Sequence, residues 1–237
     1  MRNPTAYRAP GGFSLVELLT VIAVIGILIA ILVPVASNIM DNARRTAAAS
    51  NLRQIALAYN SYSQEGSRPR SIDAANIYEW ATVLAERANL NSPDLYILGD
   101  DPLVERSGRD FPRNIATPPA DGTAGRWIVS PDFNGHPLSV AVANRLASRA
   151  NATTTPVVWT RGLGTNGRWA PLDSANPGVY GDRGGHIAFL DGRVEFFRDL
   201  SEDGGQLLNF VSRQTTGNIR DALNPGAQAL DSNGQVF

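Results

Sequence analysis

A charge-free apolar run near the N-terminus constrains this chain more than any other feature. No side chain from Leu18 to Met40 is charged, and the densest part, Leu18 to Val33, is interrupted only by Thr20 and Gly26. About 20 apolar residues, each rising about 1.5 Å along a helix, match a hydrocarbon core of about 30 Å. The sequence therefore predicts a helix that crosses a membrane.

Glu17 stands directly before this run, inside the length that the bilayer would enclose. An ionised carboxylate in the apolar layer costs about 2.5–3.5 kcal/mol unless it is paired, so we expect a cationic partner. The preceding residues 1–12 carry Arg2 and Arg8 and no acid. This bias favours the cytoplasmic side for that end.

Gly11 and Gly12 precede the apolar run, whereas a secretory signal places its cleavage site after the run. A cut between Gly12 and Phe13 would remove only the leader and keep the hydrophobic segment. The new Phe13 amine would be cationic near neutral pH, since a free α-amino group has a pKa of about 7.7–8.0, and it would lie one helical turn from Glu17. This amine can pair with the Glu17 carboxylate within one chain or between packed helices. Pairing between helices would let Glu17 set the register in which subunits assemble.

The stretch Gly12-Phe13-Ser14-Leu15-Val16-Glu17 resembles the processing signature of type IV prepilins and type II secretion pseudopilins. The resemblance covers about the first 60 residues. It implies a prepilin peptidase that cuts after Gly12 and methylates the Phe13 amine, and a need for Glu17 in assembly. It also implies an inner-membrane assembly platform and a cytoplasmic motor. The alternative is an ordinary signal-anchor helix with a chance acid.

The helix is expected to continue past the membrane to about Gln64, because residues 41–62 contain no Gly or Pro. Its apolar positions recur every three or four residues and form one stripe: Ala48, Leu52, Ile55, Tyr59 and Tyr62. Gly26 and Pro34 are weak points within it. They either bend the helix or let it loosen when subunits leave the membrane and pack in a filament, and both interpretations stay open.

The predicted fold is α+β and type IV pilin-like: a long N-terminal helix, half transmembrane and half amphipathic, packed on a small antiparallel β-sheet head. We expect a leader at 1–12, a transmembrane half at 13–36, an amphipathic half at 37–64 and a head at 65–237. Within the head, patterns predict helices at 77–89, 138–150 and 206–211, a loop region at 100–121, and strands at 127–129 and 156–159.

A β-hairpin is predicted at 186–197 around Asp191-Gly192, which suits a two-residue type I′ turn. This turn would place Phe189 opposite Val194 and Ile187 opposite Phe196. The passage resembles the C-terminal hairpin of prepilin-like proteins that carry a His, nine residues and then Asp-Gly. Here Gly181 occupies the position of that His, and the nearby His stands at 186.

Composition excludes several kinds of site. The chain has no Cys, so it has no disulfide or thiolate metal site, and its formal charge of −1 gives no reason to expect nucleic acid as a partner. Residues 162–167 match G-x-G-x-x-G, but the following Arg-Trp-Ala-Pro starts no helix, so a glycine loop is expected. No nucleophile and base stand in a recognisable spacing, and we expect no enzyme.

Calcium is the one cofactor that the residues leave open. Asp199, Glu202 and Asp203 lie within five residues beside two glycines, and hard cations bind oxygen ligands in such loops. The spacing is not that of an EF-hand. A solvated acidic turn explains the same residues.

The sequence thus predicts a non-enzymatic filament subunit of a type IV pilus-like fibre or a type II secretion pseudopilus. It would be a single-pass inner-membrane protein with a periplasmic head, and would join a homo-oligomer or mixed filament in the periplasm or at the cell surface. One alternative is an envelope enzyme that carries a pilin-like anchor. The other is a monomeric, membrane-anchored module whose head binds a ligand. Arg106, Arg109 and Arg113 offer a small basic patch for that role, although neighbouring acids dilute it.

Overall fold

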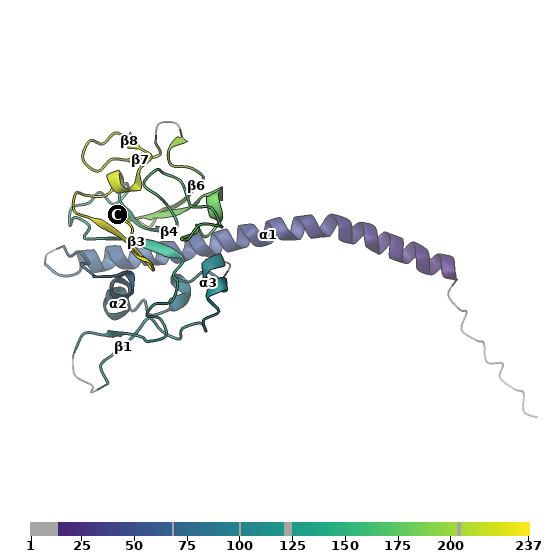
Figure 1. Cartoon of the computed structure of the whole chain (residues 1–237), viewed down its shortest axis with the longest axis horizontal. Coiled ribbons are helices and arrows are strands. Elements are labelled where there is room, and N and C mark those ends of the chain that lie inside the picture. Colours follow the sequence, from purple (N-terminus) through teal and green to yellow (C-terminus); the bar gives the residue numbers. More distant parts are fainter. Residues whose placement is uncertain (1–13, 68, 100, 121–124, 203–204) are drawn as a thin grey trace, which may run out of the picture. The chain divides into compact units, whose positions relative to one another are not determined.

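The computed structural model describes residues 14–67, 69–99, 101–120, 125–202 and 205–237, with the side chains at 34–38 and 235 outside that description (Figure 1). The chain divides into two compact units, Met1–Arg45 and Thr46–Phe237. The division falls inside the first helix and groups the second half of that helix with the head. The predicted boundaries at residues 12, 36 and 64 separate the leader, the transmembrane half, the amphipathic half and the head. These boundaries stay predictions.

Helix α1 (Leu15–Gln64) runs for 50 residues and includes both Gly26 and Pro34. Its second half carries the expected stripe, since Ala48, Leu52, Ile55 and Tyr59 are all buried. Tyr62 is only partly buried and lies at the edge of the core. The long helix and its amphipathic half are therefore confirmed, and the chain leaves the helix through Gly66, whose φ of +88° suits a residue without Cβ.

Six antiparallel strands form the main sheet of the head, in the spatial order β10-β9-β3-β4-β5-β6. They are β3 (Val140–Asn144), β4 (Pro156–Thr160), β5 (Gly185–Phe189), β6 (Val194–Phe197), β9 (Gln228–Asp231) and β10 (Gly234–Gln235). Every residue of β3, β4 and β5 is buried. The centre of the sheet is therefore covered on both faces, which confirms the α+β class with an antiparallel head.

Helix α2 (Ile77–Arg87) joins α1 to the sheet. Asn76 caps it by accepting a hydrogen bond from the Glu79 amide at 2.9 Å. Trp80 stacks on Tyr59 of α1 with ring centroids 5.7 Å apart and donates to the Ala143 carbonyl of β3 at 3.1 Å. One buried indole therefore contacts both helices and the sheet, and the predicted helix at 77–89 is confirmed with a slightly earlier end.

The helix predicted at 138–150 is wrong, because residues 140–144 form strand β3 in the middle of the sheet. Val140 pairs with Thr160 of β4, and Val142 also pairs with Leu230 of β9. A short, wholly apolar run has the same pattern in a buried strand as in a buried helix, so periodicity could not decide between them. Pairing on both sides with distant strands decided it.

Two further predictions in the head are wrong. The expected loop at 100–121 contains helix α3 (Pro102–Ser107) and strand β1 (Ala116–Thr117), which pairs with β2 (Ile128–Val129). Asp101 caps α3, and Pro102 is its first residue. Such a pair is a helix start signal, but the predicted loop rested on the number of prolines in this stretch. The helix expected at 206–211 is replaced by β7 (Leu207–Leu208), paired with β8 (Thr215–Thr216). Three 3-10 turns complete the described elements, at Pro93–Leu95, Gly181–Arg183 and Ile219–Ala222.

The β5–β6 hairpin forms as predicted, but its register is shifted by one residue. Ala188 pairs with Val194 and Ile187 with Glu195, in place of the expected partners. The loop has three residues and not two, because Gly192 takes a φ of +84° after a turn closed by its amide and the Phe189 carbonyl at 2.9 Å. A Cβ at Gly192 would lie 2.6 Å from the end of the Leu57 side chain of α1, but the positive φ is the stronger reason for glycine there.

Candidate functional site

Ser14 and Glu17 form a reciprocal cap at the start of α1. The Ser14 amide donates to Glu17 Oε2 at 2.9 Å, and the Glu17 amide donates to Ser14 Oγ at 3.2 Å. This S-x-x-E pattern is a capping box, which satisfies two amides that have no partner inside the helix. The pattern is readable in the sequence, and it gives Glu17 a hydrogen-bond partner besides the predicted cation.

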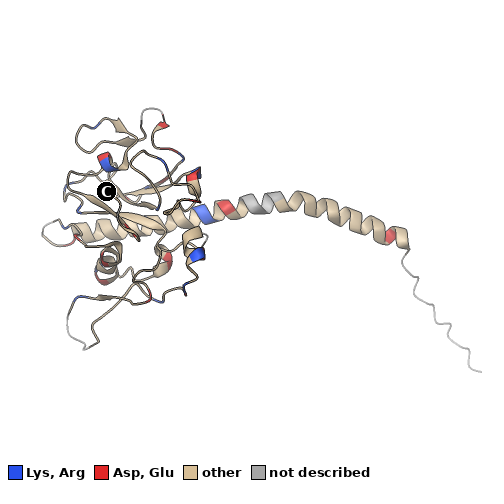
Figure 2. Ribbon diagram, viewed as in Figure 1, with Lys and Arg blue, Asp and Glu red and all other residues tan. Residues whose placement is uncertain are grey.

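Glu17 is followed by a long stretch without charge. Among the described residues, one helical segment is long and apolar enough to cross a membrane, Leu15–Val33, with a mean hydropathy of 3.0 and none of it buried within the chain. Figure 2 shows a single acidic position near the start of the helix and then no charged position over several turns. The structure thus leaves an apolar helical surface without a partner, immediately after a carboxylate.

Gly26 lies in the middle of this apolar surface. A Cβ placed there would meet no atom within 4 Å, so the position is open. Ala23 and Ala30 stand three residues before and four after it, on the same face of the helix. Small residues on one face let helices approach closely in lipid. The flexibility expected at Gly26 and Pro34 stays a prediction, since the side chain at 34 is outside the described residues.

The cleavage residues Gly12 and Phe13 lie outside the described residues, as does the leader. Their processing, methylation at Phe13 and the pairing of the Phe13 amine with Glu17 therefore remain predictions. What the structure adds is the position of Ser14, the first described residue, whose amide is already bound to Glu17.

The calcium candidates do not gather into a ligand set within the described part of the chain. Asp199 accepts hydrogen bonds from Ser201 Oγ at 2.5 Å, from the Ser201 amide at 2.8 Å and from Arg168 Nε at 2.7 Å. The bonds from Ser201, followed by Arg168, hold the pKa of Asp199 below its usual value. Glu202 is exposed, Asp203 lies outside the description, and no group of three acidic or histidine side chains is assembled among the described residues. The calcium site stays an untested prediction.

Two arginines of the basic patch are bound to the protein itself. Arg106 donates to the Leu172 carbonyl at 3.1 Å, and Arg109 donates to the carbonyls of Gly135 and Asn134. A shallow cavity of about 500 Å³ beside them is lined by Arg109, Asp110, Phe111, Arg113 and Asp132, so acids and bases alternate. This surface gives no net attraction to a polyanion.

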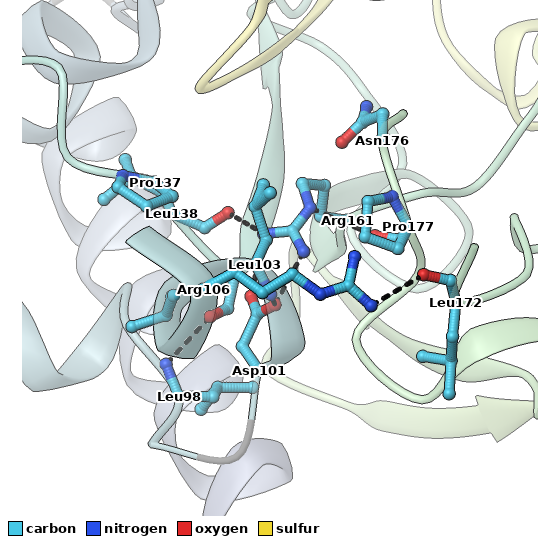
Figure 3. Close-up of polar contacts among 12 residues, drawn as sticks. Leu98, Asp101, Leu103, Arg106, Pro137, Leu138, Arg161, Leu172, Asn176 and Pro177 are labelled. Carbon is cyan, nitrogen blue, oxygen red and sulfur yellow. Dashed lines mark hydrogen bonds and ion pairs between the residues drawn. The ribbon is translucent and has the colours of Figure 1, made fainter. Parts of the chain in front are cut away.

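A buried ion pair is the strongest polar feature that the sequence did not reveal (Figure 3). Arg161, at the end of β4, donates from Nη1 and Nη2 to the two oxygens of Asp101, each at 2.7 Å, and neither side chain is exposed. Arg161 also donates to the carbonyls of Leu138 at 2.6 Å and Pro177 at 3.1 Å. Asp101 accepts from the Leu103 amide at 2.9 Å and so caps α3. Because the pair is enclosed and its groups are bonded, it fixes the head and offers no reactive group.

Other polar side chains are also enclosed in the head. Burial raises the pKa of Tyr78 to about 12 and raises that of Tyr96 further, which keeps both phenols neutral. His186 is buried on β5, where its ring lies 5.0 Å from Phe196 and 5.7 Å from Tyr180. The glycine loop at 162–167 carries a β-bridge between Leu163 and Trp169. A side chain at Gly162 would meet the backbone of Gly178, a packing reason for that glycine.

A family model described as the prokaryotic N-terminal methylation motif matches residues 8–33. The chain carries a prepilin-type N-terminal methylation motif. The match covers the leader end, the capping box and most of the apolar helix, and it does not extend to the head. No curated protein and no solved structure matches the chain.

This prepilin-type motif suggests a pilin or pseudopilin and implies processing by a prepilin peptidase. Together with the apolar helix it also suggests membrane anchoring or secretion. A long apolar helix followed by an antiparallel β-sheet head is consistent with a pilin-like fold, and proteins of this kind are typically not enzymes. The His-x9-Asp-Gly resemblance gains no support, because Gly181 occupies the His position in a 3-10 turn.

Proposed function

We propose that the protein is a structural subunit of a type IV pilus-like filament or a type II secretion pseudopilus. In this proposal it is cut after Gly12, methylated on Phe13 and polymerised through α1. The observation that carries the proposal is the apolar segment Leu15–Val33, which no described part of the chain covers and which begins beside one carboxylate. In the membrane lipid covers this surface, and in a filament other copies do.

Glu17 has two partners in this scheme, one in the precursor and one in the assembly. Its own helix supplies the first, through the Ser14 amide. Cleavage creates the second, the cationic Phe13 amine of a neighbouring subunit. Both bonds are charge-assisted, because the acceptor is a carboxylate, but only the amine also neutralises that carboxylate, which a membrane interior favours. The carboxylate therefore caps the helix of a lone subunit and selects the register of a packed one.

Assembly also needs helices that approach closely in the absence of water. The apolar span offers Ala23, Gly26 and Ala30 on one face, and packing at such small residues drives helix association in lipid. The proposed location follows from the same span: a single-pass inner-membrane protein with a periplasmic head, held in a periplasmic or surface filament after assembly. An inner-membrane platform and a cytoplasmic motor complete the set of proposed partners.

Three variants separate the charge of Glu17 from its capping role. Glu17→Gln keeps an oxygen that accepts from the Ser14 amide but removes the charge. Ser14→Ala keeps the charge and removes half of the capping box, and Asp41→Ala removes the next acid of α1 as a matched control. We expect Glu17→Gln to lose surface filaments, as judged by electron microscopy of sheared cells, while Ser14→Ala and Asp41→Ala retain them.

Mass spectrometry of the subunits in membranes of the same cells checks processing, and all variants should begin at a methylated Phe13. Wild-type filament yield from Glu17→Gln would refute the charge pairing. A mature chain that keeps Met1 would refute cleavage. If the wild-type protein is cleaved but remains monomeric in the membrane, the alternative of a membrane-anchored ligand-binding module replaces the filament subunit.

A further inference from the structure

The turn between β3 and β4 contains the sequence Asn151-Ala152-Thr153, an N-x-Thr acceptor pattern for N-linked sugar. The other Asn with Ser or Thr two residues later is Asn3, whose Pro4 excludes it from this pattern. We propose that Asn151 is a site of N-linked glycosylation on the exported head. The proposal rests on the proposed function in one respect only, namely that the head leaves the cytoplasm.

The side chains of Asn151 and Thr153 are held together on the surface. Thr153 Oγ1 donates to Asn151 Oδ1 at 2.8 Å, and the Thr153 amide donates to the same oxygen at 3.0 Å. Both residues are exposed. The hydroxyl at the third position of the pattern therefore already contacts the amide that would be modified.

The nitrogen of that amide is available. Asn151 Nδ2 donates no hydrogen bond to any other described residue, whereas the amide nitrogens of Asn144 and Asn224 donate to the carbonyls of Ala74 and Arg145. Modification at those two asparagines would break contacts that hold loops together. At Asn151 it breaks none within the described part of the chain.

The backbone of the turn is anchored separately from these side chains. The Asp191 amide donates to the Ala152 carbonyl at 2.9 Å, and Arg193 Nη2 donates to the Thr153 carbonyl at 2.8 Å. The Thr155 amide closes the turn on the Asn151 carbonyl at 3.0 Å. The β5–β6 hairpin thus holds the main chain of the turn in place. The side chains of Asn151 and Thr153 remain exposed, so an enzyme can reach them.

The transfer would take its sugar from a lipid-diphosphate-linked oligosaccharide, with a membrane oligosaccharyltransferase as catalyst. A bond forms between Asn151 Nδ2 and the anomeric carbon, and the bond between that carbon and the diphosphate oxygen breaks. The lipid diphosphate leaves with the bonding electrons. The proton lost from Nδ2 passes to a carboxylate of the transferase. An amide nitrogen is a weak nucleophile because its lone pair is delocalised into the carbonyl, so polarisation of Oδ1 and contact with the transferase must both assist it.

The test uses the full chain, extracted from the membranes or filaments of the cells that make it. Trypsin releases the peptide Ala150–Arg161. We expect this peptide to carry an added hexose or N-acetylhexosamine mass, which fragmentation that preserves side-chain modifications places on Asn151. Recovery of the unmodified peptide alone would overturn the proposal, and so would sugar placed on Thr153, Thr154 or Thr155.

Matched threonine variants sharpen the test. Thr153→Ala should abolish the added mass and Thr153→Ser should keep it, whereas Thr154→Ala, one residue further along the same turn, should leave it unchanged. Equal loss in Thr153→Ala and Thr154→Ala would contradict the proposal. Thermal melting of Asn151→Gln and Thr153→Ala, produced in a host without N-glycosylation, should match that of the wild-type chain and so exclude misfolding.

The two proposals fail separately. Glu17→Gln should lose filaments and keep the sugar on Asn151. Addition of the sugar requires export of the head but does not require polymerisation. Asn151→Gln should lose the sugar and keep cleavage at Gly12.

Discussion

The apolar half of α1 exposes apolar side chains, whereas the head buries charged ones. Residues 15–33 expose large aliphatic side chains, such as Leu32 at 67% exposure, while the head buries a charged pair, Asp101 and Arg161, at 0%. A helix satisfies its own backbone hydrogen bonds wherever it lies, so the first region needs a partner only for its side chains. In the head, by contrast, residues of the head itself supply the hydrogen-bond partners of the buried pair. In the proposed function, lipid or other copies of the chain cover the first region, whereas residues of the head itself enclose the buried pair.

Breaking the buried pair should produce the largest effect. Arg161→Met leaves the Asp101 carboxylate enclosed without its counter-charge, which destabilises by about 3–5 kcal/mol. Urea unfolding of the detergent-solubilised chain measures the change. The double variant Asp101→Leu with Arg161→Met should recover most of the loss, because buried ion pairs are often replaceable by apolar groups. A double variant as unstable as the single one would show that the bonds to Leu138 and Pro177 matter more than the charge.

A matched pair of leucines within α1 tests the comparison directly. Leu52 is fully buried and Leu32 is exposed, so Leu52→Ala should lower the free energy of unfolding of the head by about 2–5 kcal/mol and Leu32→Ala should leave it unchanged. Tryptophan fluorescence during urea unfolding reports the head, where all four tryptophans lie. Similar losses in the two variants would mean that the apolar half of α1 contributes to the stability of the head.

A charge in the centre of the apolar span should affect membrane insertion and leave the head intact. Ile25→Arg adds about 2.5–3.5 kcal/mol to the cost of a spanning helix. Alkaline extraction of membranes should then release more of the variant than of wild type, while the urea midpoint of the head stays the same. Ile25→Leu serves as the control. Unchanged extraction of Ile25→Arg would argue that this helix does not span the bilayer.

The smallest expected effect concerns Asp199. Its hydrogen bonds from Ser201 and Arg168 lower the pKa of the carboxyl in the folded head, so the stabilisation is present above the ordinary pKa of 3.8 and is lost as pH falls through the lower, folded value. Asp199→Asn should therefore lower stability slightly near neutral pH and change it least below the folded pKa, which flattens the acid limb of the stability–pH curve. A rise in stability at pH 7 that calcium causes in the wild-type chain and not in Asp199→Asn would instead support the metal site.

Local sequence patterns predicted an element correctly where the residues of that helix or turn are sufficient to form it. The long helix, the stripe from Ala48 to Tyr59 and the second helix at 77–87 follow from spacing alone. Strand β3 did not, because its apolar run fits a buried helix equally well until β4 and β9 lie beside it. The hairpin at Asp191-Gly192 was placed correctly but in the wrong register, since Gly192 takes a left-handed φ of +84° and closes a three-residue loop in place of the two-residue turn.

The candidate site divides in the same way. Glu17 and the apolar span are visible in the sequence, and so is the capping box with Ser14, once S-x-x-E is considered. The Asp101–Arg161 pair carries no local signal, because 60 residues separate its members and either side chain alone resembles a surface charge. Only the meeting of the end of β4 with the start of α3 brings them together.

The sequence by itself determined where this protein is apolar and where one carboxylate stands at the start of the apolar run, and it carries the proposed cleavage site, because each depends on residues within a few turns of one another. The tertiary structure decided which apolar runs become strands, how the hairpin is registered and which charges are buried. Those outcomes depend on contacts between segments far apart in the chain, whose energies exceed local preference.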